Sequence, residues 1–210
     1  MKVAITKNAK ILALFAIACT AVVGLVHEST KSRIQRQEQA QLISTLQQIV
    51  PTHLHDNDMS THCVKVTDPL LGTTEQQTVY LGTMADKPSS LAITSVAPDG
   101  YNGNIHIISA FDTAGNLTGM RVLKHKETPG LGDKVEVRKS DWALSFAGKS
   151  AQDIASPSWL VKKDGGFIDQ FTGATITPRA VVKAVKNAAN YVNEHQITLY
   201  KQTNSCEQTQ

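Results

Sequence analysis

Residues 90–127 read SLAITSVAPDGYNGNIHIISAFDTAGNLTGMRVLKHKE, a stretch with three apolar runs that are rich in β-branched residues. Turn sequences separate these runs at Pro98-Asp99-Gly100 and at Ala114-Gly115-Asn116. Side-chain character alternates within the second run, which is typical of a strand with one buried face. The pattern predicts consecutive antiparallel strands, and residues 110–123 are expected to form a hairpin.

Shorter apolar runs flank this stretch. HCVKVTD at residues 62–68 and QTVYLGTM at residues 77–84 are typical of strands, and the segments WLVKK and GGFID within residues 159–169 also have strand character. Ser140 is expected to cap a short helix over residues 141–146.

The clearest helical pattern lies near the C-terminus. Thr177 is predicted as the N-cap and Pro178 as the first helical residue, and the helix is expected to end near Glu194-His195. Small and β-branched residues recur on one face at helical spacing: Val181, Val182, Val185, Ala188, Ala189 and Val192. The sequence therefore predicts an α+β fold, with a mostly antiparallel sheet domain and peripheral helices.

The N-terminal region predicts a membrane anchor. Residues 11–26, ILALFAIACTAVVGLV, carry no charge over sixteen positions and span roughly 24 Å as a helix, a short but sufficient transmembrane length. Ala16-Ile17-Ala18 also resembles a signal-peptide cleavage site, but cutting there would leave an apolar new N-terminus, which favours an uncleaved anchor. Residues 27–50 are weakly amphipathic and typical of a helical stalk that Pro51 ends.

This organisation divides the chain into five parts: a tail (1–10), a single transmembrane anchor (11–26), a stalk (27–50), one main domain (51–200) and a C-terminal tail (201–210). A short lysine-bearing tail usually stays in the cytoplasm, and a long domain after the anchor is translocated largely regardless of its charge. We therefore expect the main domain outside the cytoplasm.

The net charge of +3 is unevenly distributed. Residues 1–36 contain six basic residues and one acidic residue, whereas residues 37–210 contain fifteen basic and seventeen acidic residues, a net charge of −2. The basic character therefore belongs to the membrane end of the chain. Because the main domain lacks a basic face, nucleic-acid binding is disfavoured.

Common catalytic and metal-binding motifs are missing or incomplete. The glycine-rich segment 129–134 lacks the third glycine of a dinucleotide fingerprint and the spacing of a P-loop, and no esterase or zincin motif supports a hydrolase. Metal-ligand residue types cluster over 53–58, but this cluster is typical of a solvated loop, and no metal site is predicted. Cys63 and Cys206 would both lie outside the cytoplasm, where they form one disulfide or remain free thiols.

The segment that precedes the last helix reads DQFTGATITP over residues 169–178. Gly173 and Ala174 are small enough to let a backbone or a ligand approach closely, and three threonine hydroxyls cluster where the helix begins. The free N–H groups and the dipole of a helix N-terminus attract anions, phosphate in particular. The segment therefore predicts a phosphate site, or else a turn that only caps the helix.

Three segments resemble those of FMN-binding-domain proteins. Asp169-Gln170-Phe171-Thr172-Gly173-Ala174-Thr175 is similar to D-x-x-T-G-A-T, the motif in which flavin transferase joins FMN through its phosphate to the final threonine. The resemblance implies covalent FMN at Thr175, with Asp169, Thr172, Gly173 and Ala174 read by the transferase. Two upstream segments are similar to G-Y-x-G and E-T-P-G-L-G: Gly100-Tyr101-Asn102-Gly103 and Glu127-Thr128-Pro129-Gly130-Leu131-Gly132. We expect the second to form a rigid loop against the flavin or its phosphate, the alternative being a plain surface loop.

Chain length, anchor and motif set together resemble the G-subunit family of Rnf (Rsx) ion-translocating electron transport complexes. The resemblance implies a covalent flavoprotein subunit, without turnover of its own, that relays electrons through FMN in a complex coupling electron transfer to ion export. Its partners would be the other subunits, the membrane and, for maturation, flavin transferase. Its expected location is the bacterial inner membrane, with the N-terminus in the cytoplasm and the FMN-binding domain in the periplasm.

Two other identities remain open at this point. The C subunit of the sodium-translocating NADH:quinone oxidoreductase shares the domain and the motif but is generally longer. A non-redox extracytoplasmic binding or sensory module with the same fold is the second alternative, although such a module has no need of a transferable hydroxyl at Thr175.

Overall fold

The computed structural model describes residues 2–150, 156 and 158–206. The chain divides into two compact units, residues 1–43 and 44–210. Residue 1 of the predicted N-terminal tail, residues 151–155 and 157 of the predicted main domain and residues 207–210 of the predicted C-terminal tail lie outside the described residues.

One long helix, α1 (Lys2–Ile49), makes up the first unit and reaches into the second. Its large apolar side chains from Ile5 to Val26 are exposed, and it is long and apolar enough to cross a membrane. The predicted apolar helix is therefore present, and it continues without interruption through the residues predicted as a stalk. It ends just before Pro51, because a proline ring disfavours helical geometry in the preceding residue.

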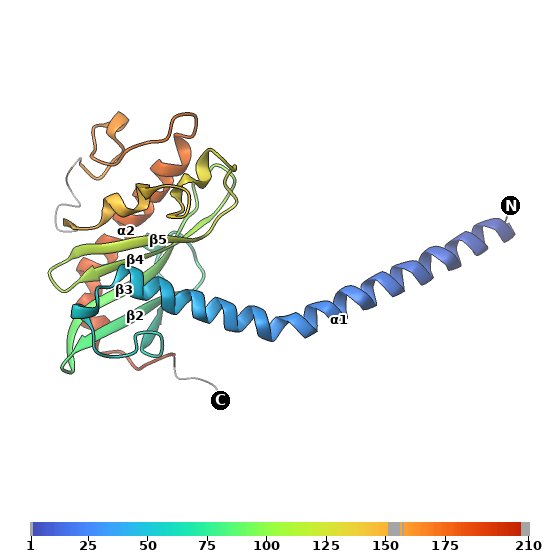
Figure 1. The fold of residues 1–210 in the computed structure, drawn as a ribbon, viewed down its shortest axis with the longest axis horizontal. Coiled ribbons are helices and arrows are strands. Elements are labelled where there is room, and N and C mark those ends of the chain that lie inside the picture. The colour runs from blue at the N-terminus through green and yellow to red at the C-terminus, as the bar shows by residue number, and fades with distance from the viewer. Residues whose placement is uncertain (1, 151–155, 157, 207–210) are drawn as a thin grey trace. The chain divides into compact units, whose positions relative to one another are not determined.

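The second unit is built on an antiparallel sheet with six strands among the described residues, each paired with the next along the chain (Figure 1). The strands are β1 (Cys63–Val66), β2 (Gln77–Met84), β3 (Lys87–Ala97), β4 (Ile105–Asp112), β5 (Asn116–Lys124) and β6 (Lys149–Ser150). The α+β class and the consecutive antiparallel strands are confirmed, as is the predicted hairpin, in which Ala110 of β4 lies opposite Gly119 of β5.

The turn between β2 and β3 has no strong sequence signal. Ala85 and Asp86 alone connect the two strands, and their φ angles are positive, 50° and 60°. Two central residues with positive φ match the right-handed twist of a tight hairpin, but glycine or asparagine usually supplies them. Strand β3 consequently begins at Lys87, before the apolar run predicted from residue 90.

Helix α2 (Ile176–Leu199) covers one face of the sheet (Figure 1). Its buried stripe packs against side chains of β3 and β4, such as Ile93 and Ile107, in one apolar core. The end of α1 packs against β5, where the Thr118 hydroxyl donates a hydrogen bond to the Ile49 carbonyl at 2.6 Å. Helix α2 also contacts the 3₁₀ helix η3 (Gly132–Val135), so the start of α2 lies beside the loop that follows β5.

The limits predicted for the last helix are wrong at both ends. The helix begins at Ile176, with Thr175 as the N-cap residue. Pro178 is its third residue, and proline is tolerated there because an N–H at that position would have no intrahelical partner. Thr177 is not the N-cap, because its hydroxyl donates to Glu127. The helix extends to Leu199, past the predicted end at His195, because Leu199 is buried in the core.

The strand character of WLVKK and GGFID is also not realised. Val161 and Ile168 form only an isolated parallel bridge, and the 3₁₀ helix η6 (Lys162–Asp164) lies between them. Gly165, with a φ of 91°, turns the chain back immediately, so neither segment extends far enough to pair as a strand. The short helix predicted after Ser140 is present as the 3₁₀ helix η4 (Asp141–Phe146), and the Ser140 hydroxyl accepts from the Trp142 N–H at 3.2 Å.

The C-terminal segment is fixed to β1 at the edge of the sheet. Cys63 and Cys206 are joined in a disulfide with their Cα atoms 5.2 Å apart. The Asn204 side-chain oxygen accepts from the backbone N–H groups of both cysteines, at 3.0 Å each. Residues 200–206 are thereby held against the domain.

Candidate functional site

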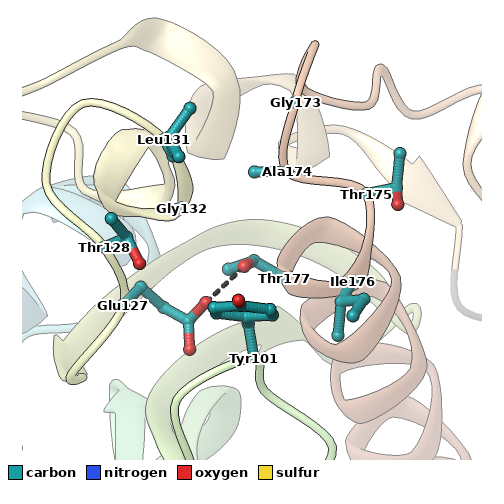
Figure 2. Close-up of a pocket in the computed structure, with 10 residues that line it drawn as sticks. All are labelled: Tyr101, Glu127, Thr128, Leu131, Gly132, Gly173, Ala174, Thr175, Ile176 and Thr177. Atoms are coloured by element: carbon teal, nitrogen blue, oxygen red, sulfur yellow. Dashed lines mark hydrogen bonds between the residues drawn. The ribbon is translucent and has the colours of Figure 1, made fainter.

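A pocket of about 290 Å³ lies at the N-terminus of α2. Its walls come from the turn after β3, the loop after β5 and the segment that enters α2, which are the three segments that resemble an FMN-binding domain (Figure 2). The lining residues are Tyr101, Glu127, Thr128, Leu131, Gly132, Gly173, Ala174, Thr175, Ile176 and Thr177. Segments far apart in the sequence therefore meet at one site.

A tight turn delivers the chain to the first residue of α2. The Ala174 N–H donates to the Phe171 carbonyl at 3.3 Å, and Gly173 has a φ of 82°, a conformation that glycine adopts without strain. Thr175 follows at the rim of the pocket and is half-buried (Figure 2). The first N–H groups of α2 have no intrahelical partner, so they and the helix dipole favour an anion beside Thr175.

The loop after β5 forms the opposite wall. The Thr128 carbonyl accepts from the N–H groups of Leu131 and Gly132, at 3.2 and 3.1 Å, and Gly130 has a φ of 78°. A Cβ on Gly132 would lie 2.8 Å from both the Glu127 Oε2 and the Thr177 Oγ1 atoms. The loop is therefore a closely packed turn, and glycine at position 132 is required by space.

A buried carboxylate joins all three walls. Glu127 is 5% exposed, and its Oε1 atom accepts from the Asn102 N–H at 3.0 Å. Its Oε2 atom accepts the hydroxyl of Thr177 (Figure 2). The sequence identifies Glu127 as part of a loop but carries no signal for this partner, because Thr177 is fifty residues further along the chain.

A second set of polar side chains, His125, Glu136 and Arg138, lies behind Glu127. The Glu127 N–H donates to Nδ1 of His125 at 3.0 Å, and Nε2 of His125 lies 2.6 Å from the carboxylate of Glu136, which Arg138 also contacts at 2.8 Å. Burial raises the pKa of Glu136, but hydrogen bonds from His125 and Arg138 outweigh burial and leave the pKa below its ordinary value. The ionised carboxylate thereby orients the His125 ring.

The remaining residues of the predicted flavinylation motif face outward. Asp169 pairs with Lys162 at 2.7 Å on the surface, while its backbone carbonyl accepts from the Trp142 indole N–H at 2.5 Å. Thr172 is exposed. Among the described residues, Gly173, Ala174 and Thr175 line the pocket whereas Asp169 and Thr172 do not. In the predicted loop, Pro129 and Gly130 also lie outside the lining.

The mouth of the pocket is apolar. Tyr101, Leu131 and Ile176 are 67%, 42% and 46% exposed, and each comes from a different wall. Exposed large apolar side chains that gather around a pocket are typical of a binding site. The site therefore combines an anion-binding helix N-terminus with an apolar rim.

Comparisons with known proteins place this site in a family. A family model described as the FMN-binding domain matches residues 100–190, and one described as the RnfG N-terminal region matches residues 1–49. The first match contains the whole pocket and the second ends where α1 ends. The fold and the site thus define an FMN-binding domain that follows an N-terminal helix able to cross a membrane.

Curated relatives narrow this class further. The G subunit of the ion-translocating oxidoreductase complex of Vibrio atlanticus is 51% identical over 203 residues, which are 97% of each chain. The proteins of the same name are 48% identical in Vibrio parahaemolyticus, over 98% of each chain, and 49% identical in Shewanella loihica, over 99% of this chain and 98% of the relative. The chain belongs to the family of ion-translocating oxidoreductase complex G subunits, which confirms the resemblance noted in its sequence.

The residues of the pocket fit FMN. The free N–H groups of the α2 N-terminus and the Thr175 hydroxyl suit a phosphate, and Gly132 and Gly173 let backbone approach a ligand closely. Tyr101, Leu131 and Ile176 suit the apolar part of a flavin. The volume is at the small end of the range for ligand sites, so the pocket encloses only part of a molecule of this size.

Proposed function

We propose that this chain is an electron-transfer subunit of an ion-translocating oxidoreductase complex and carries FMN as a phosphoester of Thr175. The family membership and the names of the relatives support the complex, and the FMN-binding-domain match supports the cofactor. The observation that carries the attachment point is the position of Thr175. Its hydroxyl belongs to the last residue before α2, at the rim of the pocket and next to the free N–H groups of the helix.

Attachment requires one new bond. The Thr175 hydroxyl oxygen bonds to the phosphorus of FMN, its proton is released, and the phosphorus loses the leaving group of the flavin donor that a flavin transferase uses. The protein gains the mass of FMN less one water. The exposed side chains of Asp169 and Thr172 leave the recognition motif readable by that enzyme.

The chain's own residues then hold and surround the cofactor. The N-terminus of α2 stabilises the phosphate charge, the loop from Glu127 to Gly132 closes one side, and the apolar rim contacts the rest. Bound FMN supplies a ring that accepts and donates one or two electrons. A covalent tether keeps the effective concentration of flavin high at a shallow site, and we infer no turnover by the isolated subunit.

We propose a periplasmic location for this chemistry. In this proposal, residues 1–10 form a cytoplasmic tail, residues 11–26 the anchor and residues 27–50 the stalk. The FMN-binding domain, residues 51–200, follows the stalk in the periplasm, and residues 201–210 form the C-terminal tail. A disulfide between Cys63 and Cys206 is typical of an oxidising compartment and supports this orientation. A domain outside the cytoplasm has no cytoplasmic FMN pool to replace lost cofactor, which favours covalent attachment. We also propose that the complex exports ions, as the resemblance of the sequence to Rnf G subunits implies.

In-gel fluorescence tests the attachment. The full chain is produced with a flavin transferase, denatured and run on a gel, because denaturation releases flavin that is not covalently bound. We expect a fluorescent band for the wild type and for Thr78→Val, a control that removes a buried hydroxyl outside the pocket, and no band for Thr175→Val. A band of wild-type intensity from Thr175→Val contradicts the proposal.

A further inference from the structure

The buried carboxylate of Glu127 has a role that flavin attachment alone does not explain. We propose that Glu127 is a positioning residue: through Thr177 it holds the first turn of α2, and with it the Thr175 hydroxyl, where the flavin transferase can modify it. This inference rests on the proposed function. It assigns Glu127 no contact with the reacting atoms.

Hydrogen bonds link Glu127 to the first turn of α2. A buried carboxylate requires donors, and the two it has come from different walls of the pocket, the Asn102 N–H at 3.0 Å and the Thr177 hydroxyl. Thr177 is the second residue of α2, and Thr175 is the residue immediately before the helix. Fixing the Thr177 side chain therefore restricts where the helix begins and where Thr175 stands.

Close packing around the carboxylate restricts the movement of the Glu127 side chain. A Cβ on Gly100 would lie 3.1 Å from Oε1 of Glu127, and a Cβ on Gly132 would lie 2.8 Å from Oε2. Backbone therefore closes on both oxygens, which leaves the side chain little room to move. The N–H of Glu127 is held in turn by His125 at 3.0 Å. The carboxylate is thus a fixed reference point between the loop and the helix.

Both oxygens of Glu127 act as acceptors, one for the Asn102 N–H and one for the Thr177 hydroxyl. Glutamine at this position replaces one of the two oxygens with an NH₂ group, which cannot accept a hydrogen bond. Glu127→Gln therefore cannot receive both hydrogen bonds, and the hold on the first turn of α2 is weakened.

Four variants of the full chain test this role. Thr177→Val removes the donor and keeps the shape, Thr177→Ser keeps the hydroxyl, and Glu127→Gln replaces one of the two acceptor oxygens with a donor. Thr78→Val is the matched control, because Thr78 is also a buried threonine but lies on β2 outside the pocket. Denaturant unfolding first shows whether each variant is folded, by the presence of a cooperative transition. The initial rate of flavin attachment by purified transferase is then measured on the folded variants.

We expect Thr177→Val to fold and to be modified about tenfold more slowly, because it loses the hydrogen bond to the buried Glu127 side chain. Thr177→Ser should recover most of the rate, Thr78→Val should keep it, and Glu127→Gln should be modified more slowly than the wild type because it cannot accept both hydrogen bonds. Folded Glu127→Gln that takes up no flavin also supports the role.

Three results overturn the inference. One is a wild-type rate of flavin attachment in folded Thr177→Val. Another is an equal loss of rate in Thr78→Val. The third is failure of both Thr177→Val and Glu127→Gln to fold, which assigns the pair a purely structural role. None of these coincides with failure of the proposed function, which shows itself as a wild-type chain that has no covalent flavin.

Discussion

The pocket wall at Gly132 leaves no room for a Cβ atom. This residue is not one of the described glycines with positive φ, so its need is for space and not for conformation. We expect Gly132→Ala to lower the free energy of unfolding by about 1–3 kcal/mol, because a Cβ there would lie 2.9 Å from the Glu127 Cβ atom. It should also slow flavin attachment, since Thr177 is displaced as well.

Gly130→Ala is the comparison for this prediction. Gly130 has a φ of 78° and open space around its Cβ position, so alanine there should cost about 1 kcal/mol through backbone conformation alone. Denaturant unfolding and attachment rates measure both variants. Equal attachment rates in Gly132→Ala and the wild type would show that the pocket wall is less tightly packed than the structure indicates.

Glu136 makes the stability of the domain depend on pH. Its pKa in the folded chain lies below the ordinary value of 4.5, so the unfolded chain takes up the proton first as pH falls. The contribution of Glu136 is therefore complete above about pH 4.5 and is lost as pH falls through the lower, folded-state pKa. We expect the unfolding free energy to fall in this window, and to fall less in Glu136→Gln.

Urea unfolding at neutral pH and at a pH below 4.5 measures this difference. Glu75→Gln is a suitable control, because it neutralises an exposed glutamate away from the pocket. An acid-induced loss of stability that is as steep in Glu136→Gln as in the wild type would remove Glu136 from the explanation.

At the scale of elements, the disulfide fixes the C-terminal segment to β1. The two cysteines are 143 positions apart, so the cross-link closes nearly the whole domain into one loop. We expect Cys63→Ser with Cys206→Ser to lower the free energy of unfolding by about 2–5 kcal/mol, because the unfolded chain gains freedom. Denaturant unfolding of the full chain without reductant measures this change.

Cys19→Ser provides the control, because Cys19 is an exposed free cysteine in α1. It should leave the stability unchanged. If reductant changes neither the stability nor the gel mobility of the wild type, the cysteines are not joined and the support that the disulfide gives to a periplasmic location disappears.

Local patterns were sufficient for most elements. The runs over residues 90–127 predicted the central strands because alternation and turn residues act within a few positions. WLVKK has similar apolar character, but Gly165 reverses the chain after only a few residues, and apolar character alone does not report that. The start of α2 was misplaced because Thr177 has the ideal chemistry for an N-cap, yet Glu127 uses its hydroxyl.

The same limit applies to the site. The motif 169–175 predicted Thr175 and Gly173 correctly as neighbours of a helix N-terminus, since both lie within one turn of its start. The Glu127–Thr177 pair was not predictable, because it depends on packing that brings the loop after β5 to α2. Asn102 takes part through its backbone N–H, which no side-chain motif encodes.

At the scale of the whole molecule, the proposed function places the FMN-binding domain outside the cytoplasm. A C-terminal fusion to alkaline phosphatase should be active, because that enzyme folds in an oxidising compartment. A fluorescent protein that matures only in the cytoplasm should be dark when it is fused to the C-terminus of the full chain. The same protein should be bright when it is fused to the N-terminus of the full chain. The reverse pattern would place the flavin site on the cytoplasmic side.

The most direct test of the central claim is the mass of one peptide. Trypsin cuts after Lys163 and Arg179, so residues 164–179 are released together with the hydroxyls of Thr172, Thr175 and Thr177. In the wild type matured by flavin transferase, we expect this peptide to carry FMN less one water, and fragmentation to place the added mass on Thr175. Added mass on Thr172 or Thr177, or an unmodified peptide from fully flavinylated protein, would contradict the account.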